Sequence, residues 1–542
     1  MKSPILVISV LLIGIGVQAQ DTTGKKVKIT SSFKPVLKEA AKVNFNAAPP
    51  STDTSRPRLQ YNIPNQNLNF AFQPGTLRPL ALQVDTGANW TNESYVKLGF
   101  GNLKTPFAQV GLSVGDGKTA GVNLYGKHTS SKGKIQYQDY STTNVELNTF
   151  LKSGNIEWDA RLGALQENTK KYGITALSSI PPKDSLDVKL QTWRGRISFH
   201  NINRTELGLS YAPELRIDAF SDGLSNSESN TYLNIPVQKE LGKTFAVDVA
   251  LTASLSRYKP EKKTEVNNNF FMISPSLLYR SQNINLQAGI RPSWNKSKSR
   301  LFPNITAEVA SSDKRFSFQA GWVGYLRNSG FQYMAGINPW IWAPETVYNS
   351  SVDERYAGFK GSAGDHLSYS AKIGYNKITD QPLFTNDTSS TSGGRSFMVI
   401  NEPELKVFNF GGELGYTIGE TFSLISNIQF NQYKTKVAEK AWGLLPIEFR
   451  TALRLQVLKD LYVTTDMYTF NGPQYLRKDG SRGNLGSAMD LSAGLEFKVV
   501  KNIKLWAQFN NMLNKEYQRW NQYPVYGFNF LGGVVFSFAQ SK

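Results

Sequence analysis

Few residues in this chain have the types and spacing that enzymatic chemistry requires. Residues 111–115 read Gly-Leu-Ser-Val-Gly, but a nucleophile elbow with this pattern needs a strand, a sharp turn and a helix around its serine. The match lies inside an alternating apolar and polar segment, so we interpret it as a coincidence. His128, His200 and His366 are the only histidines, and each stands without a second histidine or a carboxylate pair nearby. The sequence therefore predicts no catalytic, cofactor-binding or metal-binding residues, and we expect a protein that is not an enzyme.

A second group of residues could bind a ligand without transforming it. Five aromatic residues gather within one short stretch: Phe331, Tyr333, Trp340, Trp342 and Tyr348. Aromatic faces can bind sugars and other flat ligands, so this group is a candidate ligand patch. The alternative is an interfacial belt of aromatic residues beside a turn.

Basic residues are the third candidate. Lys259, Lys262 and Lys263 predict a basic loop, either solvated near lipopolysaccharide phosphates or used to capture an anionic ligand. In the whole chain, 61 Lys and Arg outnumber 42 Asp and Glu, which gives a net charge of +19. This excess alone does not choose between nucleic acid, anionic lipid and simple solubility as its purpose.

The N-terminus indicates export. Lys2 precedes a 13-residue apolar run, Ile5 to Val17, and small residues follow up to Ala19. A membrane-spanning helix needs about 20 apolar residues, so we predict a cleaved secretory signal at residues 1–19. An exported chain is not expected to have a nucleic-acid partner. Because the chain contains no cysteine, disulfides and thiolate metal sites are also excluded.

From about Glu93 to Phe538 the dominant pattern has period two. In one segment Phe245, Val247, Val249 and Leu251 alternate with polar residues, and each such segment is about 9 to 14 residues long. Soluble strands average about 5–6 residues, whereas a tilted strand that crosses a bilayer needs about 9–11. We therefore predict an all-β fold, a closed antiparallel transmembrane β-barrel of about 20–22 strands over residues 81–542. The final segment, which we expect to close the barrel, carries one apolar face made of Tyr526, Phe528, Phe530, Val534, Phe536 and Phe538.

The connections are expected to alternate in length, with short periplasmic turns and long extracellular loops. Asp313-Lys314, Gln282-Asn283 and Lys501-Asn502 are predicted tight turns. Long polar stretches are predicted at Glu167–Leu186, Tyr258–Asn268, Asn376–Arg395 and Asn471–Gly486. Residues 20–80, rich in Pro, Asn and Lys, are interpreted as a basic leader in the periplasm or the lumen.

Two stretches resemble TonB-dependent outer-membrane receptors. One runs from Asn511-Met512-Leu513-Asn514-Lys515-Glu516-Tyr517 through Tyr523-Pro524 and Gly527 to the strand that ends at Phe538. The other comprises Asn338-Pro339, Pro344-Glu345 and Glu354-Arg355-Tyr356 before Ala357-Gly358. The resemblance implies a barrel in the outer membrane of a Gram-negative envelope and a role in uptake.

The sequence departs from that family before the first strand. The family's barrels are filled by a globular plug, and residues 20–80 lack the compact α/β pattern of one. Only Lys28-Ile29-Thr30 could form a short strand for an energy-coupling partner, so such a partner is left open. A barrel of this size needs its lumen filled, by the leader, by in-folded loops, by long side chains or by a periplasmic partner protein. Outer-membrane lipid and lipopolysaccharide are the other expected partners.

Two functions follow from these observations. The resemblance implies transport or uptake of a ligand across the outer membrane. The missing plug favours the alternative, a non-transporting barrel that serves as a scaffold in an outer-membrane assembly or envelope complex.

Overall fold

Long strands form where apolar and polar residues alternate, because this pattern lets a strand present one face to lipid and the other to the lumen. The computed structural model describes residues 93–173, 183–296, 298–389 and 394–539. The predicted signal peptide and basic leader lie outside the described residues. No helix among the described residues is long and apolar enough to cross a membrane.

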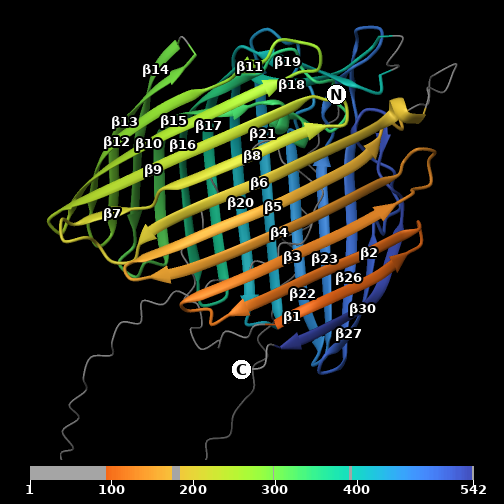
Figure 1. Cartoon of the computed structure of the whole chain (residues 1–542), viewed down its shortest axis with the longest axis horizontal. Coiled ribbons are helices and arrows are strands. Elements are labelled where there is room, and N and C mark those ends of the chain that lie inside the picture. Colours follow the sequence, from red (N-terminus) through yellow and green to blue (C-terminus); the bar gives the residue numbers. More distant parts are fainter. Residues whose placement is uncertain (1–92, 174–182, 297, 390–393, 540–542) are drawn as a thin grey trace, which may run out of the picture. The chain divides into compact units, whose positions relative to one another are not determined.

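Within the described residues, one antiparallel sheet contains 24 strands, of which two are very short (Figure 1). The 22 long strands are β1 (Glu93–Gly101), β2 (Thr105–Gly115), β3 (Ala120–Ser131), β4 (Tyr140–Ser153), β5 (Ile156–Lys170), β6 (Asp187–Asn201), β8 (Glu214–Asp222), β9 (Ser227–Leu241), β10 (Phe245–Lys259), β12 (Phe270–Arg280), β13 (Ile284–Asn295), β14 (Lys298–Ala310), β15 (Phe316–Ser329), β16 (Tyr348–Ala363), β17 (Leu367–Thr379), β20 (Leu405–Ile418), β21 (Phe422–Thr435), β22 (Ile447–Leu458), β23 (Leu461–Asn471), β26 (Ser487–Val500), β27 (Ile503–Asn510) and β30 (Asn529–Ala539). The short strands β7 (Leu209–Tyr211) and β11 (Val266–Asn267) pair with β9 and β10.

The sheet closes on itself through its first and last strands. β1 pairs with β30 from Glu93↔Ala539 to Gly101↔Leu531. The fold is therefore a closed antiparallel barrel of 22 strands, which confirms the predicted fold class. Phe530, Phe536 and Phe538 lie exposed on the outer face of the closing strand.

The lumen side of this seam has its own small core. Trp506, Leu531 and Val535 are buried there, and Tyr95 and Phe107 pack against them. The indole Nε1 of Trp506 donates to the backbone oxygen of Leu98 at 3.1 Å. The Trp506 ring occupies the space where a Cβ of Gly99 would lie, so the glycine permits the close contact.

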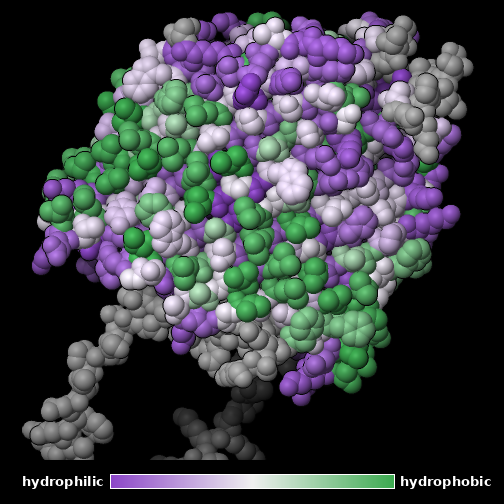
Figure 2. All heavy atoms as spheres, viewed as in Figure 1, coloured by the Kyte–Doolittle hydropathy of each residue, from purple (hydrophilic) through white to green (hydrophobic). Residues whose placement is uncertain are grey.

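The outward face of the wall is apolar. On β12, for example, Phe271, Ile273 and Leu277 are exposed, while Ser274 and Ser276 between them are buried. Figure 2 shows hydrophobic residues spread over the wall and hydrophilic residues gathered along its upper end. An exposed apolar belt of this extent fits contact with lipid rather than with water.

The two ends of the barrel differ. At one end, the turn end, β1 begins, β30 ends and the connections include 281–283, 311–315 and 501–502, where tight turns were predicted. At the other end, the cap end, the connections include 171–186, 330–347, 380–404 and 511–528. These connections hold additional short elements: η1 (Lys183–Leu186), α1 (Phe331–Ile337), β18 (Gln381–Asn386), β19 (Phe397–Glu402), β28 (Gln518–Trp520) and β29 (Tyr523–Pro524); the connection 472–486 holds β24 (Gln474–Leu476) and β25 (Arg482–Asn484).

Three strands extend further than the polar stretches suggested. β5 continues to Lys170, β10 to Lys259 and β17 to Thr379. Their last residues still pair with a neighbouring strand, and Tyr258 and Ile378 among them are buried. Hydrogen bonding between strands therefore continues beyond the apolar part of the wall.

Candidate functional site

A short helix begins the most elaborate connection at the cap end. Phe331, Met334 and Ala335 lie at positions i, i+3 and i+4, so one face of α1 is apolar, and each is only 2% exposed. The buried carboxylate of Glu228, on β9, accepts a hydrogen bond from the backbone N–H of Gln332 at 2.8 Å. Gly330 precedes the helix, and a Cβ at this position would collide with the Glu228 carboxylate. The glycine and the carboxylate together hold the start of α1 against the barrel wall.

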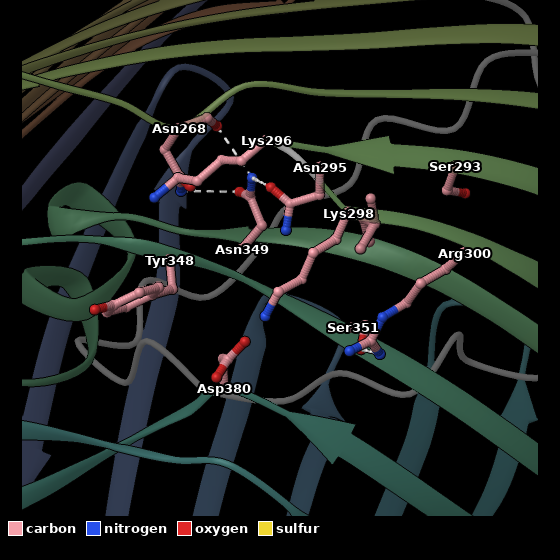
Figure 3. A pocket seen from close by; sticks show the side chains of 11 residues that line it. Asn268, Ser293, Asn295, Lys296, Lys298, Arg300, Tyr348, Asn349, Ser351 and Asp380 are labelled. Atoms are coloured by element: carbon pink, nitrogen blue, oxygen red, sulfur yellow. Dashed lines mark hydrogen bonds between the residues drawn. The ribbon is translucent and has the colours of Figure 1, made fainter.

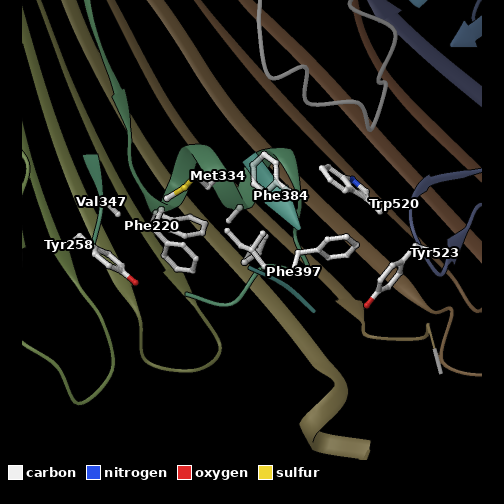
Figure 4. Close-up of a cluster of buried hydrophobic side chains, with 12 residues drawn as sticks. Phe220, Tyr258, Met334, Val347, Phe384, Phe397, Trp520 and Tyr523 are labelled. Carbon is white, nitrogen blue, oxygen red and sulfur yellow. The ribbon is translucent and has the colours of Figure 1, made fainter. Parts of the chain in front are cut away.

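Three connections meet at this end, and we call them the cap: residues 330–347, the described residues of 380–404, and residues 511–528. Their apolar side chains pack into one cluster with wall residues of β6, β8 and β10 (Figure 4). The buried members are Leu190, Phe220, Tyr258, Phe331, Met334, Ala335, Ile341, Val347, Phe384, Phe397, Trp520 and Tyr523. Burying this many large side chains gives the cap a hydrophobic core of its own.

The centre of the cap is an aromatic stack. Trp340 and Tyr523 lie nearly parallel, with ring centroids 3.7 Å apart and 20° between their planes. Tyr172, from the connection after β5, meets Tyr523 edge-on with centroids 4.9 Å apart. Its hydroxyl donates to the backbone oxygen of Pro524 at 3.0 Å. Three connections thus converge on one pair of rings.

Hydrogen bonds tie the cap to distant sectors of the wall. The Tyr258 hydroxyl, on β10, donates to the backbone oxygen of Pro344 at 2.7 Å. The Trp340 Nε1 donates to the backbone oxygen of Lys170, at the end of β5, at 3.1 Å. Because these strands lie on sectors far from β15, β17 and β27 in the closed order, the cap spans the mouth of the barrel.

A buried carboxylate fastens a further connection to the cap. Glu402, at the end of β19 and 1% exposed, accepts hydrogen bonds from the backbone N–H groups of Lys436, Val437 and Ala438 at 2.8, 3.0 and 2.7 Å. Burial acts to raise the pKa of Glu402, but these N–H groups stabilise the carboxylate and bring its pKa below its ordinary value. Glu402 is therefore a charged latch between β19 and the connection 436–446.

Below the cap, the lumen side of the wall is polar, and several of its charged groups are held by hydrogen bonds or an ion pair. Arg291 donates to Ser274 Oγ at 2.9 Å, to the Gly324 backbone oxygen at 2.7 Å and to Asn304 Oδ1 at 3.1 Å. Lys372 Nζ lies 2.6 Å from a Glu354 carboxylate oxygen, and both side chains are largely buried. A wall of this kind can accommodate water and polar solutes.

Comparison with known proteins identifies the architecture. No family model matches the sequence, and no curated protein matches it. The siderophore receptor PirA from Acinetobacter baumannii superposes with a TM-score of 0.60 at 10% identity, over 82% of this chain and 80% of that one. The FrpB iron transporter from Neisseria meningitidis, F5-1 variant, superposes with a TM-score of 0.63 at 10% identity, over 83% of each chain. A mutant of the ferric enterobactin receptor PfeA from Pseudomonas aeruginosa gives 0.60 at 11% identity, over 83% of this chain and 81% of that one.

This chain has the barrel fold of the TonB-dependent receptors. At these identities the likeness concerns the fold. The two stretches that resemble those receptors in sequence meet in this barrel, because Trp340 follows the first Asn-Pro pair and stacks on Tyr523 of the second stretch. These two stretches are more than 180 residues apart in the chain, so the sequence alone could not show that they meet in the cap.

The receptor-type barrel places the five aromatic residues of the candidate ligand patch in different surroundings. Phe331 is enclosed in the cap core, and Tyr333 and Trp340 pack against that core. Trp342 is 42% exposed and Tyr348 is 38% exposed. The five rings therefore do not form one open platform, and only these last two present much surface.

Trp342 lies beneath a buried cation. Lys171 Nζ is 3.9 Å from the centre of the Trp342 ring, and Trp342 Nε1 donates to Asp387 Oδ2 at 2.9 Å. Burial and the neighbouring Arg395 lower the pKa of Lys171 to about 8. This contact joins the connection after β5 to two segments of the cap.

The other candidate residues from the sequence lie in strands and connections of the barrel. Gly111–Gly115 ends β2 without a helix after it, as the interpretation of that match as a coincidence requires. The histidines lie apart, on β3, on β6 and in the connection after β16. Among the described residues no group of three or more potential ligands could hold a metal ion. In the basic loop, Lys263 pairs with Glu345 and Lys262 with Glu261.

Several residues on which the cap depends have little signal in the sequence. Phe384 and Phe397, on the paired strands β18 and β19, each meet the ring of Trp520, and no period in the sequence marks them. The hydrogen-bond partners of Glu228 and Glu402 lie 104 and about 35 positions away in the chain. Only Trp520 had a signal, since it stands beside the Tyr-Pro pair of the family-like ending.

Proposed function

We propose that this protein is an outer-membrane barrel of the uptake type, in which the cap is a gate that must open for a solute to enter the lumen. The supporting observations are the shared fold with siderophore and metal transporters, the apolar outer face and the polar inner wall. The single observation that carries the gate is the packed cap core, with its hydrogen bonds to β5 and β10.

In this proposal the cap end faces the outside of the cell and the turn end faces the periplasm. Barrels of this class have long connections outside and short turns inside. Both β1 and β30 meet the turn end, so the leader predicted at residues 20–80 would enter from the periplasm, where it or a partner protein can occupy the lumen. Lipid and lipopolysaccharide surround the wall.

A disulfide across the cap tests the gate. A Cβ at Gly173 would lie 2.8 Å from the Cβ of Gln522, so Gly173→Cys with Gln522→Cys needs a shift of about 1 Å to reach disulfide geometry. The chain has no native cysteine that could compete. The bond would join the connection after β5 to residues 511–528.

The readout is growth of a strain that lacks this protein. The medium supplies a required solute at a concentration so low that the strain grows poorly without the protein. Wild-type protein restores growth, and we expect the oxidised double variant not to restore it until a reductant is added. Each single cysteine variant is the matched control and is expected to behave like wild type. Full restoration by the oxidised lock would contradict a moving gate.

The second candidate function is that of a scaffold, and the firm packing of the cap against the wall is the observation that favours it. A scaffold needs no passage, so the locked barrel would keep its activity and would co-purify with a partner protein in fixed stoichiometry. Pull-down from detergent-solubilised membranes, performed on the locked variant, therefore separates the two functions.

A further inference from the structure

The β13–β14 hairpin stands apart from the strand that follows it. β13 and β14 stay paired to their tip, at Asn295↔Lys298. In contrast, β14 and β15 pair only up to Asn304↔Val323, although β15 remains paired with β16 as far as Ser329↔Tyr348. The hairpin tip therefore separates from β15 at the cap end of the barrel.

A pocket of about 190 Å³ fills this separation (Figure 3). One side is formed by the hairpin and the other by the upper parts of β15, β16 and β17 with the residues that follow them. The lining residues that carry the argument are Asn268, Lys296, Lys298, Arg300, Tyr348 and Asp380. We call this the hairpin pocket.

The hairpin pocket has an excess of positive charge. Lys296, Lys298 and Arg300 face a single carboxylate, that of Asp380. Among the described residues none of these three cations has a carboxylate oxygen within 4.0 Å. Arg300 is held in place by hydrogen bonds to Ser351 Oγ and, at 3.4 Å, to Thr379 Oγ1. Cations that are positioned but not neutralised favour an anionic ligand.

The same pocket contains an unsatisfied acceptor. Asn268 is fully buried, and its Oδ1 has no hydrogen-bond partner among the residues that the structure describes. Its amide nitrogen is already committed to Asn349 Oδ1 at 2.9 Å, and Asn349 in turn donates to Asn295 Oδ1 at 3.0 Å. A buried acceptor without a donor is costly, so a ligand hydroxyl or amine at this position would be stabilising.

Size and shape restrict the ligand further. A volume of 190 Å³ is about six times the roughly 30 Å³ that one water occupies in the liquid. Pockets for drug-sized ligands begin at about 300 Å³. The ring of Tyr348, with Lys296 Nζ 5.2 Å from its centre, forms one apolar surface of the pocket. The pocket therefore suits one sugar ring with an anionic group, and not a large chelate.

We propose that the hairpin pocket binds a phosphate monoester carried on a sugar, with Lys296, Lys298 and Arg300 around the phosphate and Asn268 and Asp380 accepting from the sugar. This chemistry occurs in the headgroup of lipopolysaccharide and in soluble sugar phosphates. The proposal does not depend on transport, although the lipid source requires the cap end to lie at the outer leaflet.

Binding to the purified full-length chain in detergent tests the proposal. The probes are glucosamine 1-phosphate, glucosamine, inorganic phosphate and lipid A in mixed micelles, each measured by calorimetric titration. We expect glucosamine 1-phosphate to bind more tightly than either of its parts. Tighter binding of lipid A than of glucosamine 1-phosphate would assign the lipid source, and tighter binding of the soluble ester would assign the soluble one. No preference for the ester over glucosamine would overturn the proposal.

Two variants with opposite expected effects guard against a purely structural explanation. Lys296→Gln with Lys298→Gln is expected to weaken ester binding about tenfold or more. Lys459→Gln with Lys501→Gln removes the same charge at exposed positions of the turn end and should not weaken it. Asp380→Asn keeps the shape, and its positive φ of 56° is tolerated by asparagine. We expect it to strengthen binding of inorganic phosphate. Heat-modifiable gel mobility shows whether each variant forms a folded barrel. Equal ligand affinities in all folded variants would contradict the proposal.

Discussion

The wall and the cap of this barrel are stabilised by contacts of different range. In the wall, each long strand pairs with the long strands that precede and follow it in the chain. The pairing of β1 with β30 is the one non-local pairing, and it closes the barrel. In the cap, Trp340 stacks on Tyr523 and Tyr172 bonds to Pro524, so segments hundreds of residues apart share one core. The wall can therefore form from local pairing, whereas the cap requires the wall to exist first.

The largest expected effect comes from emptying the centre of the cap. Trp340→Ala with Tyr523→Ala removes the stack, and each large buried aromatic contributes roughly 3–5 kcal/mol. We expect the cap to open and the conductance of single barrels in planar bilayers to rise steeply, while the wall stays folded. Trp193, which is highly exposed on the wall, provides the control: Trp193→Ala should leave the conductance at the wild-type level.

A substitution at the seam between β1 and β30 should instead weaken the wall. Trp506→Ala leaves a cavity between β27, β30 and β1, and we expect it to cost roughly 3 kcal/mol or more. Loss of heat-modifiable mobility at a lower temperature would report the weakened wall. Phe536→Ala, on the lipid-facing side of the neighbouring strand β30, is the matched comparison. A larger loss with Phe536→Ala than with Trp506→Ala would contradict the importance of the lumen-side core.

The start of α1 offers a smaller effect. Gly330→Val drives a side chain into the Glu228 carboxylate and is expected to cost roughly 1–3 kcal/mol, as overpacking does. Limited proteolysis should cut the 330–347 connection faster while the strands remain protected. Gly411→Ala, where a Cβ would meet no atom within 4 Å, should digest like the wild-type protein.

The smallest effect concerns pH. Because the folded-state pKa of Glu402 lies below its ordinary value, its stabilisation is complete above that ordinary value and is lost as the pH falls toward the folded-state pKa. The protection factors of the amides in residues 436–446, which are exchange rates corrected for their intrinsic pH dependence, should therefore fall between pH 7 and pH 4. Glu402→Gln should exchange faster at pH 7 and lose this pH dependence; Glu439→Gln, at an exposed ion pair with Arg482, should retain it.

The comparison also explains what the sequence could predict. Alternation such as Phe245 to Leu255 determines both a strand and its lipid-facing side, so the wall was predictable almost strand by strand. The helix α1 was not, because a few apolar residues within only seven positions cannot be distinguished from a strand end. The latches of Glu228 and Glu402 depend on backbone N–H groups that only the folded barrel brings near.

The pairing of β1 with β30 has a consequence for how the protein is made. Trp506 and Leu98, which bond across this seam, are 408 positions apart. Until the final strand arrives, the growing sheet therefore presents two unpaired edges, the kind of surface from which chains aggregate. Formation of this last pairing, rather than of the local hairpins, is therefore expected to decide whether a chain becomes a barrel or aggregates.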